Sequence, residues 1–202
     1  MKKKIRKLLN EIADLDCSFK IDGKYSVTRK TDHIFQIIEL QPGSGTKSNR
    51  FRINFGWQFE WNIKDNNVDT FAIVFDVSDL EGVHSDTWFN CTTEESAERS
   101  MAYAMKWIAD KVIPFLNRYN SIRSLLNENI DYESSLDNNS FESLIFGRSI
   151  DWRHYNFGFA LNNLGEIGPS KHHFKLVLEK YTDDRIPFQK ERADRIRAVL
   201  SN

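Results

Sequence analysis

Residues 50–61 decide the fold of this chain: Arg50-Phe51-Arg52-Ile53-Asn54-Phe55-Gly56-Trp57-Gln58-Phe59-Glu60-Trp61. Every odd position holds a large apolar side chain, and every even position holds a polar or small one. Successive side chains of a β-strand point to opposite faces, so this alternation predicts a strand with one aromatic face. Such a face must be covered, and the rest of the chain has to supply the cover.

Further strand signals on both sides of this stretch predict an antiparallel sheet of about five strands. Asp22-Gly23 is a tight hairpin signal, and the short loops between neighbouring segments favour an antiparallel meander. The segment 33–41 carries apolar residues on both faces, which is typical of a central strand. The predicted strands are 19–22, 25–30, 33–41, 50–61, 70–77 and a short further one within 86–91.

A long helix that begins near Thr93 is the predicted cover of the aromatic face. Thr92 and Glu95 have the spacing of a capping box at its start, and Pro114 predicts a kink or a new first turn further on. An amphipathic helix is expected over 3–15, because apolar residues recur there at three- and four-residue spacing.

Strand signals vanish after residue 120, and the remainder of the chain is predicted to be helical. The segments expected to be helices are 122–126, 141–146, 155–164, 172–181 and 189–200. The sequence therefore predicts an α+β fold with a sheet domain over 1–120. A helical region over 121–202 is packed on that domain or appended to it.

Composition narrows the function classes. Of 202 residues, 28% are charged and the formal net charge is -1, which argues against broad electrostatic capture of nucleic acid. Cys17 and Cys91 fit no metal or redox spacing. No apolar segment is long enough to span a bilayer, so we expect a cytoplasmic protein without membrane contact.

Several ordered stretches of the chain are similar to a bacterial family known as domain-of-unknown-function family 4304. The stretches are Tyr25-Ser26-Val27-Thr28-Arg29-Lys30, Phe35-Gln36-Ile37-Ile38-Glu39-Leu40-Gln41, Phe51-Arg52-Ile53-Asn54-Phe55-Gly56, Asp86-Thr87-Trp88-Phe89 and Ile113-Pro114-Phe115-Leu116. The resemblance covers roughly the first two-thirds of the chain and implies an α+β fold with a helical tail. It implies no catalytic residue. Residues 157–181 separately resemble one tetratricopeptide-like helical hairpin.

Catalytic signals are weak, because the chain has no phosphate loop, dinucleotide fingerprint, zincin motif or nucleophile elbow. His84 and Asp86 form the one local His/acid pair on a predicted strand edge. With Asp76 they could form a general base and its orienting carboxylate, or part of a metal site. Three further ligands are not evident, and the adjacent His172 and His173 point in different directions on a helix. We therefore predict no metal and no cofactor.

The polar face of the aromatic strand is the preferred binding site. Arg50, Arg52, Asn54 and Gln58 share this face, and either Arg29 or Lys30 from a neighbouring strand would add positive charge. Such a surface could meet an acidic partner or a phosphate backbone. A solvated sheet face, or a polar layer beneath the C-terminal helices, is the structural alternative.

Three functional hypotheses follow. The leading one is a non-catalytic protein-interaction module that uses the sheet face, the helical hairpin or both, for example a partner in a bacterial immunity or conflict system. The alternative is a hydrolase or metal-dependent enzyme that uses His84, Asp86 and Asp76. The third is nucleic-acid binding through the basic residues of 2–7 together with Arg50 and Arg52.

Overall fold

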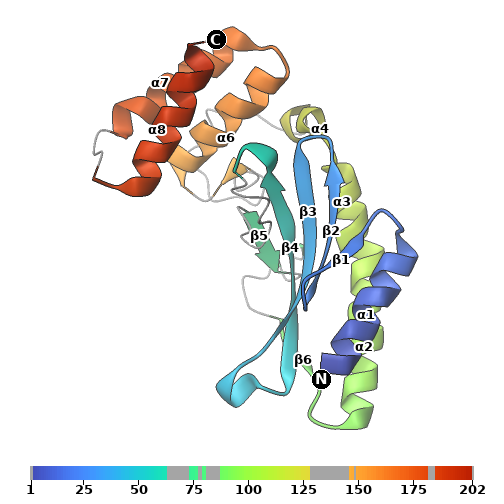
Figure 1. Ribbon diagram of the computed structural model, residues 1–202. Coiled ribbons are helices and arrows are strands. Elements are labelled where there is room, and N and C mark those ends of the chain that lie inside the picture. The colour runs from blue at the N-terminus through green and yellow to red at the C-terminus, as the bar shows by residue number, and fades with distance from the viewer. Residues whose placement is uncertain are drawn as a thin grey trace. The chain divides into compact units, whose positions relative to one another are not determined.

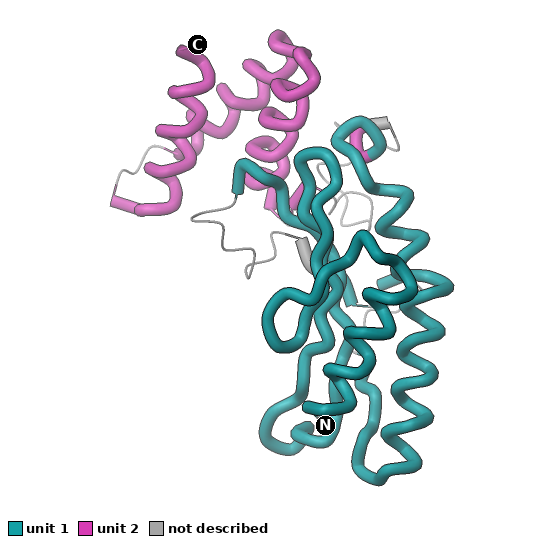
Figure 2. The backbone as a smooth tube through the Cα atoms, turned by 45° about the vertical axis from the view of Figure 1, so that its right-hand side comes forward, with its two compact units in different colours: residues 1–124 teal, residues 125–202 magenta. Residues whose placement is uncertain are grey.

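The computed structural model describes residues 2–62, 73–76, 79–80, 87–127, 146–147, 149–181 and 185–201. The chain forms two compact units, unit 1 (residues 1–124) and unit 2 (residues 125–202), which Figure 2 shows in separate colours. Unit 1 contains an antiparallel sheet with helices, and the described part of unit 2 is helical. The fold is therefore α+β with a C-terminal helical region, as the sequence predicts.

Unit 1 is organised around a sheet whose strand pairs are all antiparallel. Strands β1 to β5 lie side by side in chain order, and β6 pairs with the beginning of β4. β3 and β4 are the longest strands and form the centre of the sheet (Figure 1). The strands are β1 (Lys20–Asp22), β2 (Ser26–Thr31), β3 (Ile34–Pro42), β4 (Arg50–Phe59), β5 (Ile73–Asp76) and β6 (Phe89–Asn90).

β4 has the predicted aromatic face. Five of its side chains are 0% exposed, namely Phe51, Ile53, Phe55, Trp57 and Phe59. The strand ends at Phe59, because Glu60–Asn62 forms a 3-10 turn. Trp61 therefore lies outside the strand, although its ring still stacks on Phe59 with centroids 4.7 Å apart.

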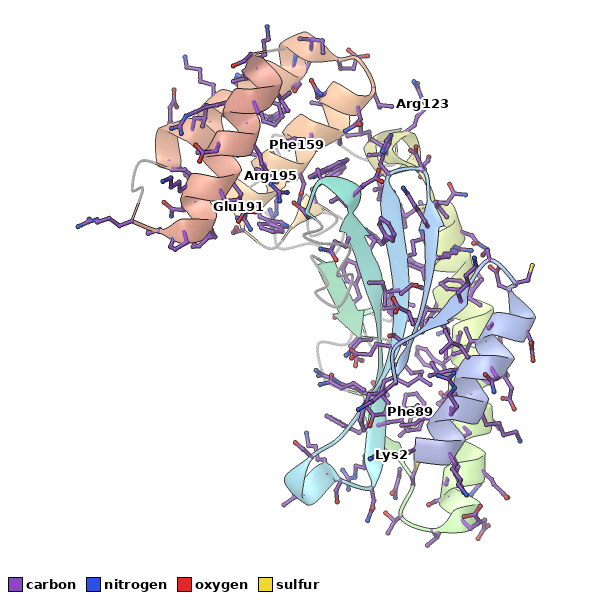
Figure 3. All side chains as sticks on the ribbon, viewed as in Figure 1. Lys2, Phe89, Arg123, Phe159, Glu191 and Arg195 are labelled. Carbon is purple, nitrogen blue, oxygen red and sulfur yellow. The ribbon has the colours of Figure 1, made fainter. Side chains whose placement is uncertain are left out.

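Three helices of unit 1 lie on the same side of the sheet (Figure 1). They are α1 (Lys2–Leu15), α2 (Glu94–Trp107) and α3 (Ile113–Arg118). From α3, the Phe115 ring meets Phe55 edge-on at 5.6 Å, and Tyr119 just beyond the helix lies 5.7 Å from Trp57. Phe89 of β6, labelled in Figure 3, stacks on Phe51 at 5.0 Å. The helices thus supply the cover that the aromatic face requires.

The helix α2 begins one residue later than predicted. Its N-cap is Thr93, whose side chain accepts a hydrogen bond from the backbone N–H of Ser96, while the Ser96 side chain accepts from the Thr93 N–H. The predicted box of Thr92 and Glu95 is therefore wrong by one position. Thr92 Oγ1 instead donates to Asn90 Oδ1 in the turn that precedes the helix.

Pro114 opens a new helical segment, as the sequence predicts. A π-helical turn over Ile108–Val112 separates α2 from α3, and Pro114 lies in the first turn of α3. Proline has no N–H to donate, and its ring would clash with the carbonyl four residues earlier in a regular α-helix. The π-helical turn over Ile108–Val112 is wider than an α-helical turn and so leaves room for the proline ring.

Unit 2 contains α6 (Ile150–Asn163), α7 (Ile167–Lys180) and α8 (Pro187–Leu200), while α4 (Ile122–Asn127) lies at the boundary between the units. The helices α6 and α7 form a hairpin that closes at Gly165, where φ is +80°. Gly158 permits their close approach, because a Cβ added there would lie 2.6 Å from the Phe174 ring. Ser170 Oγ donates to the Gly158 carbonyl across the same interface.

Three predicted elements fall partly outside the described residues, and one of them is the short strand within 86–91, whose first residue is not described. The structure describes only Ile73–Asp76 of the predicted strand 70–77, and only Phe146 of the predicted helix 141–146. No helix among the described residues is long and apolar enough to span a membrane.

Gly158→Ala should destabilise unit 2 by about 1–3 kcal/mol, because the new methyl group would overlap Phe174. Chemical denaturation followed by far-UV circular dichroism measures the loss. Gly168→Ala on α7 is the matched control, since a Cβ there meets nothing within 4 Å and alanine is the better helix former. Equal stability of the two variants would contradict the close packing at Gly158.

Candidate functional site

The even positions of β4 form the face of the sheet opposite the helices, which we call the open face. Arg50 is exposed and Arg52 half-buried on this face, whereas Asn54, Gly56 and Gln58 are buried. Arg50, Arg52 and Asn54 follow one another along it. Strand pairing places Gln41 of β3 opposite Arg52, and Glu39 opposite Asn54. Asp76 of β5 pairs with Asn54 from the other side. Neighbouring strands therefore bring a set of polar side chains together on one surface.

Hydrogen bonds order the centre of this set. Gln41 Oε1 accepts from Arg52 Nε at 2.7 Å and from Asn54 Nδ2 at 2.8 Å. Asn54 Nδ2 also lies 2.9 Å from Glu39 Oε2. Asn54 is only 5% exposed, so it links its neighbours from within the sheet surface and does not reach into solvent. Arg52 is thereby held in a defined orientation.

Positive charge gathers around one tryptophan at the end of the open face. Lys47 Nζ lies 4.6 Å from the centroid of the Trp88 ring, and the Arg52 guanidinium lies 5.6 Å from it. Arg50 is exposed and pairs with Asn90 of β6. We call Lys47, Arg50, Arg52 and Trp88 the basic cluster. Within the described part of the chain, Lys47 and Arg50 form no salt bridge.

Gln58 does not belong to this cluster. It is six residues from Arg52 along β4, which corresponds to about 20 Å of strand. The side chain is 4% exposed, and its Nε2 donates to the Asn62 carbonyl at 3.3 Å. Its Oε1 is buried without a hydrogen-bond partner in the described structure. The residues that were predicted to form one binding site therefore lie at two separate places along β4.

Arg29 lies on the face opposite to the one expected. Strand pairing places it beside Gln36, on the helix-covered side, while Lys30 occupies the open side. Arg29 Nε donates to Gln36 Oε1 at 2.7 Å, Nη1 to Asp16 Oδ2 at 2.8 Å and Nη2 to Asn117 Oδ1 at 2.6 Å. A one-residue difference along a strand reverses the face, so only Lys30 of the two alternatives can contribute charge to the open face.

The catalytic candidates are not brought together within the described structure. His84 and Asp86 lie outside the described residues. Asp76 lies on the open face, where its Oδ1 accepts from the Thr87 N–H at 3.4 Å and its own N–H donates to Asp79 Oδ2 at 2.7 Å. Among the described residues, no group of three or more His, Cys, Asp or Glu side chains could hold a metal ion.

The structure reveals a histidine–carboxylate pair that sequence reasoning missed. His33 Nδ1 lies 2.8 Å from Glu60 Oε2, and Lys30 Nζ lies 2.5 Å from Glu60 Oε1. The hydrogen bond from Lys30 and that from His33 lower the pKa of Glu60. These side chains are about half exposed, so the arrangement is a surface ion-pair network. Residues 33 and 60 come together only because of the register in which β3 pairs with β4. No local sequence pattern predicts that register.

A second histidine pair lies inside unit 2. His154 of α6 and His173 of α7 are each 7% exposed, and their Nδ1 atoms are 3.0 Å apart. One ring must donate and the other accept, so the accepting ring is uncharged when this bond forms. Burial lowers the pKa of both, that of His173 to about 4. The neighbouring His172 is exposed, so the adjacent pair in the sequence is not the pair in the structure.

In unit 2, a half-buried arginine also stacks against aromatic rings. The Arg192 guanidinium of α8 lies 3.5 Å from the centroid of Trp152 and 5.2 Å from that of Phe188. Its Nη1 donates to the Tyr181 hydroxyl at 3.1 Å. On the same helix, Glu191 and Arg195 pair one turn apart (Figure 3). The contacts of Arg192 with Trp152 and Tyr181 attach α8 to the hairpin.

Comparisons with protein-family models, with curated proteins and with solved structures find no match to this chain. The resemblance to domain-of-unknown-function family 4304 and the likeness of the tail to a tetratricopeptide hairpin stay predictions.

Arg29→Ala should lower the stability of unit 1 by about 2 kcal/mol, because Asp16, Gln36 and Asn117 lose hydrogen bonds to a charged donor. Thermal or urea unfolding measures the change. Lys30→Ala, next along the strand but exposed, is the control and should cost less than about 1 kcal/mol. A small loss for Arg29→Ala would contradict its structural role.

Acid should destabilise unit 2 through His173. The pKa of this side chain falls from 6.5 to about 4 on folding, so the unfolded chain takes up a proton that the folded chain excludes. The stability is complete above pH 6.5 and decreases as the pH falls toward 4, by about 2 kcal/mol at pH 5. Urea unfolding at pH 7 and pH 5 tests this. His173→Gln should reduce the difference by that amount. His172→Gln should change it much less, because the charge of His172 is the smallest cause of the lowered pKa of His173.

Proposed function

We propose that this protein is a non-catalytic interaction module whose basic cluster binds an acidic segment of a partner protein. The observation that carries the proposal is the position of Lys47 and Arg52 over the Trp88 ring, with the exposed Arg50 two residues before Arg52 on the same face of β4. Tryptophan and arginine are the residue types that contribute most binding energy at protein interfaces.

The cluster is suited to binding because its parts are already ordered. The hydrogen bond from Arg52 Nε to Gln41 fixes the guanidinium plane, so little side-chain freedom would be lost on binding a carboxylate. Arginine presents its N–H groups to carboxylates in a planar fork, whereas lysine adds a compact charge. Lys47 and Arg50 are exposed, which makes both cations accessible from solvent.

An acidic protein segment fits these features better than nucleic acid does. The formal net charge of the chain is -1, and Glu39 and Asp76 lie on the same open face beyond Arg52. These carboxylates would repel a phosphate backbone that continued along the sheet. A short acidic segment can bind to the basic cluster alone, without extending along the sheet to these carboxylates. A partner in a bacterial immunity or conflict system is one concrete version, which no residue of the chain specifies.

The hydrolase or metal-enzyme alternative requires His84 and Asp86 to converge with Asp76. Two of these three residues lie outside the described structure, so the geometry adds no support to it. Substitutions of these three residues would affect an enzymatic activity but not the proposed binding, so the two hypotheses can be distinguished by experiment.

The double variant Lys47→Glu/Arg50→Glu should weaken binding of a fluorescent oligoglutamate peptide by about tenfold or more, measured by anisotropy. The peptide stands in for the acidic segment. Lys20→Glu/Lys24→Glu is the matched control, because it makes the same change of charge at exposed positions of the β1–β2 hairpin. Affinity should fall between about 50 mM and 200 mM salt for the wild type.

Oligothymidylate provides the competing test. Tighter binding of this oligonucleotide than of oligoglutamate would favour the nucleic-acid hypothesis. Equal binding of oligoglutamate by the cluster variant and the control variant would refute the proposed site. A partner that is captured from cells by the wild type and by the control, but not by the cluster variant, would extend the result to the native ligand.

A further inference from the structure

A groove of about 430 Å³ runs between α1 and α2 on the outer surface of unit 1. Figure 1 and Figure 2 both show the two helices side by side. Leu8 and Met101 lie at the bottom of the groove, and Ala102 is exposed at its edge. An apolar floor between two helices is the kind of surface on which a further helix packs.

The two walls of the groove carry opposite charges. On α1, Lys4 and Lys7 line the groove together with one acidic residue, Glu11, whereas Glu94 and Glu98 line it on α2. Lys4 Nζ and Glu94 Oε1, 2.5 Å apart, form an ion pair between the walls. Lys7 is 80% exposed and makes only a loose contact of 3.7 Å with Glu11, and Glu98 is exposed.

The charges on the two walls restrict which kind of helix can bind in the groove. A uniformly acidic helix would be repelled by the α2 wall, and a uniformly basic helix by the α1 wall. The partner needs an apolar strip with basic residues on one side and acidic residues on the other. The α1–α2 surface of a second copy of this chain meets that requirement.

We propose that two copies of this protein associate through their α1–α2 surfaces in a two-fold symmetric dimer. A two-fold axis parallel to the helices and centred over the groove places α1 of each copy above α2 of the other. The Lys4–Glu94 pair shows that residues 4 and 94 lie at the same level along the helices. Lys7 and Glu98, about one turn further on, are then also level and face each other across the interface.

The symmetry gives the interface two Lys7–Glu98 pairs, one on each side of the two facing groove floors. Charged pairs that flank an apolar seam determine partner choice and orientation in helical assemblies. The open face lies on the other side of the sheet from α1 and α2, so the dimer would leave the basic cluster accessible. This inference does not depend on the proposed binding function.

The test is the mass in solution, measured by light scattering and sedimentation. The wild type should have twice the 23.7 kDa of the chain. Lys7→Glu and Glu98→Lys should each weaken dimerisation by about tenfold or more, because each change places like charges opposite each other twice. The double variant Lys7→Glu/Glu98→Lys should restore the dimer, since it restores both attractive pairs.

Mixing the two single variants is the sharpest experiment. In a mixed dimer, glutamate at position 7 meets lysine at position 98, and glutamate at position 98 meets lysine at position 7. The mixture should therefore form a heterodimer under conditions in which each variant alone is a monomer. Lys106→Glu, an exposed change elsewhere on α2, is the control and should remain dimeric.

Two results would overturn the inference. One is a wild-type mass of 23.7 kDa at every concentration up to about 1 mM. The other is a dimer that the single variants do not weaken, or that the double variant and the mixture do not restore. A binding partner of another kind in the groove would give the first of these results.

Discussion

Burial of one face of β4 is the constraint on which unit 1 depends. Five consecutive inward side chains are fully buried there, and burial of each contributes roughly 1.5–3 kcal/mol. The sheet alone cannot exclude water from this face, so α1, α2 and α3 must lie against it. Because side chains alternate along a strand, the same packing leaves the even positions of β4 on the other face. The core thereby decides where a binding surface can form.

A polar network crosses this core and connects its elements. Arg29 joins the end of α1, the strand β3 and the helix α3 through Asp16, Gln36 and Asn117. Gln36 Nε2 in turn donates to the carbonyls of Leu116 and Tyr119. Each group would be costly to bury alone, and the network is stable because its members satisfy one another. A shift of β2 against β3 by one residue would separate Arg29 from Gln36, so the network supports the register of these two strands.

The two proposed surfaces of unit 1 lie on opposite sides of the same sheet. The basic cluster lies on the open face, and the α1–α2 groove lies beyond the helices that cover the other face. A dimer formed through the groove would therefore display two basic clusters at once. Two linked clusters can bind a multivalent acidic partner far more tightly than either cluster alone, provided the spacing matches.

The sequence by itself determined the class of the fold and the aromatic strand, because alternation with period two has only one structural meaning. It also placed Arg50, Arg52 and Asn54 on one polar face, since that follows from the same alternation. The face of Arg29 depended on the register of β2 against β3, which no local pattern contains. Lys47 and Trp88 met Arg52 only because a loop and a separate strand converge on β4, and His154 met His173 only because α6 and α7 pack closely at Gly158. Local periodicity determines which way a side chain points, whereas contacts between segments distant in the chain exist only after folding has brought them together.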